Sequence, residues 1–224
     1  MFCPADNGHL EEFKKFEKSL RKFHSEEELP LIRVDNNIKD PHFWYRAKPI
    51  IAKDLIKDYE IVIGADCDQI ILAPLNEIWE GNFDVAVVNN DPSYPIQTWD
   101  LTHPAIVNNG LVVLKSKAFI DHWYRLCYSP HFLNYQYREQ DLLTLLCSDY
   151  YNYNVKRLDM GSKAYGEIAK PFWSQFRMKD GKVMLGDKQL CVIHFGGGSG
   201  DPSKGNYRIR FSEDVVEYIE SLIK

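Results

Sequence analysis

Apolar residues follow two different spacings along the chain, one typical of helices and one typical of buried strands. The helical spacing is clearest near the N-terminus, where apolar residues three or four positions apart alternate with charged ones: Leu10, Phe13, Phe16, Leu20 and Phe23. This spacing predicts an amphipathic helix. Three other runs, 61–65, 84–88 and 111–114, are almost entirely apolar and rich in β-branched residues. Such runs are typical of strands buried on both faces, as in a parallel sheet.

The remaining segments continue the alternation of strand and helix. We expect short strands at 31–34 and 190–193 and helices at about 44–58, 118–127 and 140–147, with a last helix after Ser212, which can cap it. Pro49 indicates that the regular part of the second helix starts there. The alternation predicts an α/β fold with a mostly parallel central sheet flanked by helices. Because the chain shows no internal repeat or low-complexity linker, we expect residues 1–224 to form a single domain.

Composition and charge narrow the range of functions. A formal net charge of −5 argues against a general nucleic-acid binder, which needs a basic face. No run approaches the roughly 20 apolar residues of a membrane helix, so no transmembrane segment is expected. The five cysteines are scattered and no pair has CxxC spacing, which argues against a zinc cluster and a disulfide framework. Free thiols, together with the lack of a signal peptide, indicate a cytoplasmic protein.

The pair Asp66 and Asp68 follows directly after the apolar run 61–65. In open α/β sheets, ligands bind at the carboxyl ends of strands. The alternation of a strand would point both carboxylates the same way, and two like charges side by side favour a bound cation. Oxygen ligands suit a hard divalent ion. A solvated turn is the alternative interpretation, but the apolar residues on both sides of the pair favour a metal site.

His194 directly follows the apolar run 190–193 and precedes a glycine-rich loop that begins at Gly196. A histidine at a strand end can be a metal ligand or a structural core residue. Glycines let backbone amides approach phosphate oxygens, and Lys204 could neutralise a diphosphate. The alternative is that 196–205 is only a turn.

These segments together resemble a known family. The stretch 61–75, with Asp66-Cys67-Asp68 and Pro74-Leu75, resembles the metal-binding segment of GT-A glycosyltransferases, in particular the retaining family 8 that includes glycogenin and bacterial lipopolysaccharide galactosyltransferases. The resemblance extends, with gaps, over about residues 2–207. It implies a GT-A fold, which is Rossmann-like. It also implies a UDP-sugar donor and Mn²⁺ as the cofactor, with Mg²⁺ as the alternative.

The resemblance assigns roles to individual residues. The metal ligands would be Asp66, Asp68 and His194, with Asp66 also near the ribose. The residues that would bind the rest of the donor are Asp6 and Asn7 at the base, Arg46 or Lys48 on the helix before the metal strand, Asn109 and Gly110 at the sugar, and Gly196 and Lys204 at the diphosphate. Lys204 lies further along the chain from His194 than the lysine of the family does.

The segment Glu139-Gln140-Asp141 resembles the family's catalytic segment. Gln140 would lie under the reacting sugar face and Asp141 would contact sugar hydroxyls. A neutral amide is a poor base and nucleophile, so the resemblance implies retention of configuration by front-face attack. Two alternatives stay open. Asp141 or Glu139 could be the base of an inverting enzyme, and the acids could simply favour the first turn of a helix.

Two rival functions and the acceptor also stay open. A nucleotidyltransferase that makes nucleotide sugars would share a related sheet, but residues 4–8 lack the glycine-rich signature of that class. A non-catalytic carbohydrate- or nucleotide-binding module is the other rival. The acceptor could be a glycan, a lipid, a protein or a small molecule. Aromatic loop residues are candidates for its walls, namely Tyr94, Trp99, His103, Phe172 and Trp173.

Overall fold

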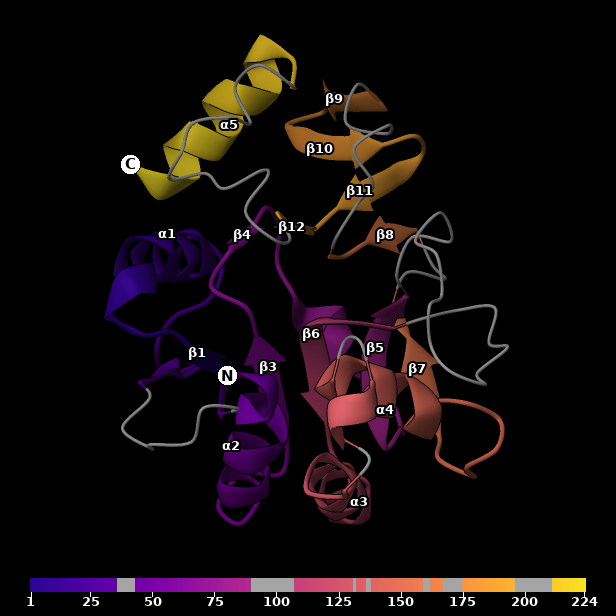
Figure 1. The fold of residues 1–224 in the computed structure, drawn as a ribbon. Helices are drawn as coiled ribbons and strands as arrows, with labels where there is room; N and C mark the ends of the chain where they lie inside the picture. Colours follow the sequence, from indigo (N-terminus) through magenta and orange to yellow (C-terminus); the bar gives the residue numbers. More distant parts are fainter. Residues whose placement is uncertain are drawn as a thin grey trace.

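The central element of the fold is a six-stranded sheet. The computed structural model describes residues 1–35, 43–89, 107–130, 132–135, 138–158, 162–166, 175–195 and 211–224. The strands of the sheet are β1 (Phe2–Pro4), β2 (Ile32–Val34), β3 (Val62–Ala65), β5 (Val85–Asn89), β6 (Val107–Leu114) and β7 (Val155–Arg157). They lie in the order β2-β1-β3-β6-β5-β7. Figure 1 labels β1, β3, β6, β5 and β7 of this sheet.

Most strand pairs in this sheet are parallel, as the sequence predicts. β1 runs parallel to β2 and β3, and β5 runs parallel to β7. β6 is the exception, because it runs antiparallel to both β3 and β5. The apolar run 111–114 was expected to be a parallel strand, and that expectation is wrong. All eight residues of β6 are buried, and a continuous apolar run reveals burial but not direction.

Helices cover both faces of the sheet, in agreement with the predicted α/β architecture. The helices are α1 (Leu10–Arg21), α2 (Ala47–Leu55), α3 (Lys117–Cys127), α4 (Glu139–Leu146) and α5 (Glu213–Ile223). One face, which carries Ile63 and Val113, packs against α1. The opposite face, which carries Val62 and Val112, packs against α2, α3 and α4. Alternate residues of the same strands thus belong to two cores.

The helix boundaries are close to those predicted. α2 begins at Ala47, two residues before Pro49, so Pro49 lies in its first turn, where its missing N–H costs nothing. Ser212 occupies the position before α5, but its side chain makes no capping hydrogen bond. No helix in the described part of the chain is long and apolar enough to span a membrane.

A smaller β region lies beyond the end of the central sheet (Figure 1). It consists of a four-stranded sheet of β8 (Lys163–Ala164), β11 (Lys188–Leu190), β10 (Lys182–Leu185) and β9 (Phe176–Lys179), and a two-stranded ribbon of β4 (Gln69–Ile71) and β12 (Val192–His194). Of the strands in this region, the sequence predicts only the one at 190–193. That predicted strand is in fact two, because Leu190 ends β11 and Cys191 separates it from β12.

The ribbon of β4 and β12 brings together distant parts of the chain. β4 follows β3 after one turn, and its pairing with β12 places His194 opposite Gln69. α1 holds the ribbon in place, since the buried Ser19 hydroxyl accepts a hydrogen bond from the Ile71 N–H at 3.0 Å and donates one to the Phe16 carbonyl at 2.8 Å. The residues between β3 and β4 therefore face the end of β12.

Candidate functional site

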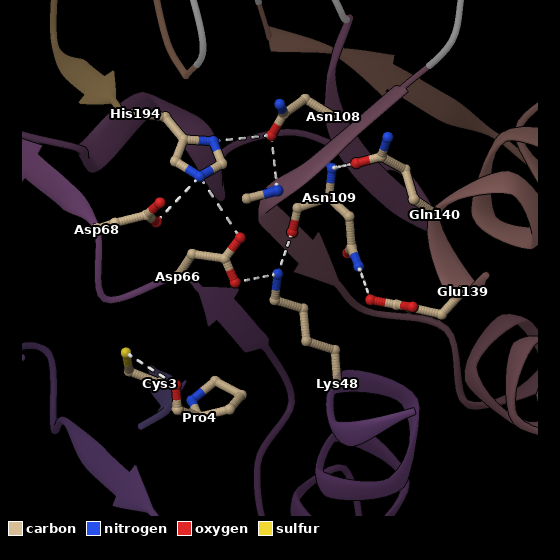
Figure 2. Close-up of polar contacts among 11 residues, drawn as sticks. Cys3, Pro4, Lys48, Asp66, Asp68, Asn108, Asn109, Glu139, Gln140 and His194 are labelled. Carbon is tan, nitrogen blue, oxygen red and sulfur yellow. Dashed lines mark hydrogen bonds and ion pairs between the residues drawn. The ribbon is translucent and has the colours of Figure 1, made fainter. Parts of the chain in front are cut away.

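Asp66, Asp68 and His194 converge at the end of β3. His194 Nε2 lies 3.0 Å from Asp68 Oδ1 and 3.6 Å from Asp66 Oδ2 (Figure 2). One ligand atom from each of the three residues lies within 4.8 Å of the others. The two carboxylates meet through a turn rather than through the alternation of a strand, because β3 ends at Ala65 and β4 begins only at Gln69.

The donor atoms of this cluster fit a divalent cation. Burial alone would raise the pKa of the Asp68 carboxyl, but the charge and hydrogen bond of His194 and the charge of Lys48 hold it below its ordinary value. Asp68 is therefore ionised at neutral pH. Two carboxylates and one imidazole can hold Mn²⁺, and the carboxylates also suit Mg²⁺. A bound cation of this kind would polarise phosphate oxygens and stabilise a departing diphosphate.

Lys48 supplies a second positive charge to the site. Its side chain is buried, and Nζ lies 2.6 Å from Asp66 Oδ1 and donates to the backbone carbonyl of Asn109 (Figure 2). The two oxygens of Asp66 thus face different partners, Lys48 on one side and His194 on the other. The guanidinium of Arg46 lies instead over the rings of Phe132 and Tyr128, at 4.4 and 4.8 Å from the ring centres. Of the two basic candidates on this segment, Lys48 is the one that contacts Asp66.

A polar pocket of about 310 Å³ opens beside the carboxylates. Its walls come from the end of β1, the short 3-10 helix Phe43–Tyr45, the start of α2, the end of β3, β6 and the start of α4. The lining residues are Pro4, Trp44, Tyr45, Ala47, Lys48, Asp66, Asn109, Arg138, Glu139 and Gln140. Arg138 has a φ of 51°, a left-handed conformation that is rare for a residue with a side chain. Such backbone conformations cluster at binding sites.

Hydrogen bonds fix the start of α4 against β6 in this pocket. Gln140 Oε1 accepts a hydrogen bond from the Asn109 N–H at 3.1 Å, and Asn109 Nδ2 donates to Glu139 Oε1 at 3.1 Å (Figure 2). Gln140 and Asn109 were both predicted as site residues, and both line the pocket. Asp141, also predicted, is buried with 1% of its surface exposed and is not part of the pocket wall in the described residues.

Glu139 has an unusual environment for a carboxyl group. Burial raises its pKa from the ordinary value of 4.5 to about 8, with a further increase from the charge of Asp66, while Lys48 and the hydrogen bond from Asn109 act in the opposite direction. The group is therefore largely protonated at neutral pH. A protonated carboxyl can donate a hydrogen bond as well as accept one, which suits contact with hydroxyl groups.

Gly110 and His194, both predicted as site residues, are in close contact. A Cβ on Gly110 would meet Nδ1 and Cε1 of the His194 ring and Oδ1 of Asn108. Only glycine leaves room for the ring there. Asn108 is not among the predicted site residues, but it is buried and its Oδ1 lies 3.3 Å from His194 Nδ1. Asn108 directly precedes the predicted site residues Asn109 and Gly110, and this neighbourhood is the signal in the sequence that could have identified it as a site residue.

The expected base-binding residues make local contacts in this structure. Asp6 Oδ1 accepts from the His9 N–H at 3.1 Å and lies 2.7 Å from His9 Nδ1, so it caps a short 3-10 helix at Asn7–His9. Asn7 Oδ1 accepts from Arg33 Nη2 at 2.9 Å. Their role toward a nucleotide stays a prediction. The remaining candidates lie outside the described residues: Gly196, Lys204, Tyr94, Trp99, His103, Phe172 and Trp173.

Comparison with known proteins identifies the fold. No protein-family model matches the chain, and no curated protein matches it. The solved structures that are similar include the bifunctional glycosyltransferase WbbM (TM-score 0.66, 13% identity), the galactosyltransferase LgtC in complex with donor and acceptor sugar analogs (0.62, 15%), and the glycosyltransferase GlyE of Streptococcus pneumoniae TIGR4 (0.59, 12%). They cover 97%, 100% and 98% of this chain, respectively.

The chain has the fold of GT-A glycosyltransferases, as predicted. It spans 96% of the LgtC chain, but only about half of WbbM (49%) and 62% of GlyE, so those two proteins are considerably longer. LgtC, a galactosyltransferase, is the kind of protein that the sequence resemblance indicated. At these identities the likeness establishes the fold, and the activity has to be argued from the site.

The pKa of Glu139 predicts a measurable pH dependence. The folded protein keeps the Glu139 proton up to about pH 8, while the unfolded chain releases it near the ordinary 4.5, so the wild type loses stability as pH rises through this interval. Glu139→Gln cannot ionise. The variant therefore escapes this loss of stability. We expect the difference in free energy of unfolding, variant minus wild type, to be larger at the upper end of the interval than at the lower end. The increase should exceed about 1.4 kcal/mol, the equivalent of one pKa unit.

Urea denaturation of both proteins at either end of the interval provides the measurement. Glu217→Gln, on the exposed side of α5, removes one negative charge at the surface and is the matched control. Identical pH dependence for wild type and Glu139→Gln would show that Glu139 ionises normally.

Proposed function

We propose that this chain is a metal-dependent glycosyltransferase that transfers a sugar from a UDP-sugar donor to an acceptor, with retention of the anomeric configuration. The observation that carries the proposal is the convergence of Asp66, Asp68 and His194 beside a polar pocket at the end of β3, in a chain with the GT-A fold. The proposed cofactor is Mn²⁺, with Mg²⁺ as the alternative.

The donor would lie across the ends of β1, β3 and β6. Asp66, Asp68 and His194 would hold the cation, and the diphosphate would lie against it. Lys48, buried and 2.6 Å from Asp66, adds positive charge at the same place. By resemblance, Asp6 and Asn7 would contact the uracil or ribose, and Gly196 and Lys204 would contact the diphosphate. The metal would supply charge stabilisation to the departing UDP.

The sugar would occupy the pocket between β6 and α4. Asn109, Gln140 and Glu139 line it and offer hydrogen-bond donors and acceptors to sugar hydroxyls. The Gln140 amide would stabilise positive charge at the anomeric carbon through its carbonyl dipole. Its carbonyl oxygen already accepts the Asn109 N–H, so the amide is oriented before the donor binds. Asp141 is proposed, by resemblance alone, as a contact to sugar hydroxyls.

The site indicates less about the acceptor, the domain organisation and the cellular location of the protein. The acceptor is a glycan, a lipid, a protein or a small molecule. We propose that residues 1–224 act as a single catalytic domain, because Asp66 and His194 are far apart in the sequence but adjacent in the structure. The five cysteines form no disulfide bonds, which supports a proposed location in the reducing cytoplasm.

Removal of one metal ligand tests the proposal directly. Asp68→Asn keeps the shape of the side chain but removes the charge that the cation needs. We expect this variant to lose Mn²⁺-dependent UDP binding in calorimetry and Mn²⁺-dependent hydrolysis or transfer of UDP-sugars, while its thermal unfolding stays cooperative. Asp187→Asn, at an exposed carboxylate remote from the site, should behave as wild type.

The same assay separates the rival functions. Transfer or slow donor hydrolysis supports the proposal. Formation of UTP from a UDP-sugar and pyrophosphate would indicate a nucleotidyltransferase, and binding without turnover would indicate a non-catalytic module. Unchanged metal-dependent UDP affinity in Asp68→Asn would refute the metal site.

Stereochemistry tests the role of Gln140. If an amide faces the anomeric carbon and no base faces the acceptor, a UDP-α-sugar should give an α-linked product, read by proton NMR. Gln140→Ala should slow transfer by about 10²-fold or more without abolishing it, because removal of one stabilising dipole costs catalysis in that range while donor binding persists. A β-linked product would instead assign a base role to Asp141 or Glu139.

A further inference from the structure

Asn108 links β6 to the candidate metal ligand His194. Its side chain is buried, with 3% of the residue exposed, and it belongs to the strand that also carries Asn109 and Gly110. Asn108 Oδ1 lies 2.7 Å from the Gly110 N–H and 3.3 Å from His194 Nδ1 (Figure 2). One oxygen atom therefore contacts a backbone donor and an imidazole nitrogen.

The Gly110 N–H determines which way the Asn108 amide points. A backbone N–H can only donate, so the atom of Asn108 that faces it has to be the oxygen and not the amide nitrogen. The same oxygen faces His194 Nδ1. Since this oxygen can only accept, Nδ1 has to carry the proton if the contact is a hydrogen bond.

This tautomer is the one that a metal site requires. In the metal-free protein Nε2 faces the carboxylates of Asp68 and Asp66 at 3.0 and 3.6 Å, where it donates a proton to Asp68. A cation would replace that proton and take the Nε2 lone pair, while Nδ1 keeps its own proton. Gly110 completes the arrangement, because the ring packs where a Cβ would otherwise lie. In metal sites, the hydrogen bond made by the other ring nitrogen fixes both the tautomer and the ring orientation.

We propose that Asn108 is a positioning residue that holds His194 with its proton on Nδ1, so that Nε2 is presented to a cation between Asp66 and Asp68. The inference rests on the proposed metal site. The chain of contacts runs from the Gly110 N–H to the Asn108 oxygen, then to His194 Nδ1, and then across the ring to the metal position. Asn108 acts through His194.

Three variants test this role by Mn²⁺ titration in calorimetry. Asn108→Leu has a similar size but no acceptor, and we expect its Mn²⁺ affinity to fall by about 10- to 100-fold, the usual effect of losing such a partner. Asn108→Asp keeps an oxygen for both donors and should bind Mn²⁺ at least as tightly as wild type. Thr144→Val is the control for damage to β6, because it removes the hydroxyl that accepts the Val107 N–H at 3.2 Å without touching His194. It should leave the affinity unchanged.

A second readout reports on the proton itself. In protein saturated with Mg²⁺, which is diamagnetic, ¹⁵N-labelled histidine should show a slowly exchanging proton on His194 Nδ1. We expect this signal in wild type and Asn108→Asp and expect it to be lost to fast exchange in Asn108→Leu.

The outcomes distinguish failure of the proposed metal site from failure of the role of Asn108. Absence of Mn²⁺ and Mg²⁺ binding to the wild type would refute the metal site and the inference with it. Metal binding by the wild type with undiminished affinity in Asn108→Leu would overturn the role of Asn108 alone. A Nδ1 proton that exchanges rapidly in the Mg²⁺-loaded wild type would also overturn it, whether or not Asn108→Leu folds.

Discussion

Two carboxylates at the end of a buried strand have to be compensated by positive charge, and the arrangement of the site follows from this constraint. Asp66 and Asp68 lie one residue apart, and their mutual repulsion in a partly buried place would be costly without partners. The structure provides Lys48 on one side of Asp66 and His194 beside both carboxylates. A divalent cation between the three ligand atoms would complete the compensation. Residues that are far apart in the sequence, from Lys48 to His194, therefore come together at one site.

The fold satisfies the constraint by bringing three segments to one edge of the central sheet. β3 delivers Asp66, the short ribbon of β4 and β12 delivers Asp68 and His194, and α2 delivers Lys48. β6 runs antiparallel between β3 and β5, so the end of β3 meets the start of β6, where Asn108, Asn109 and Gly110 lie. Among the described strands of the central sheet, β6 is the one that runs antiparallel to its neighbours, and its Asn109 lines the pocket beside Asp66.

Much of this arrangement was predictable from the sequence because burial leaves a clear trace. The continuous run at 61–65 and the helical spacing from Leu10 predict β3, its burial and α1 correctly. The apolar flanks of Asp66-Cys67-Asp68 single out the two carboxylates that the structure brings next to His194. Three features were not predictable. A continuous apolar run does not reveal strand direction, so the sequence predicts a parallel strand where β6 runs antiparallel. The strands at 163–190 are two to four residues long and partly polar, which leaves no periodicity. The choice between Arg46 and Lys48 depends on which side chain can reach Asp66, and only tertiary structure determines that.

We propose above all that Asp66, Asp68 and His194 bind a divalent cation together with the diphosphate of a nucleotide sugar. Anomalous diffraction at the manganese edge, from crystals grown with Mn²⁺ and UDP, tests it most directly. We predict one strong peak within about 2.5 Å of an oxygen of Asp66, an oxygen of Asp68 and Nε2 of His194, since metal–ligand distances do not exceed this value by much. The UDP phosphates should contact the same peak. A structure with UDP bound and no manganese at these three residues would contradict the claim.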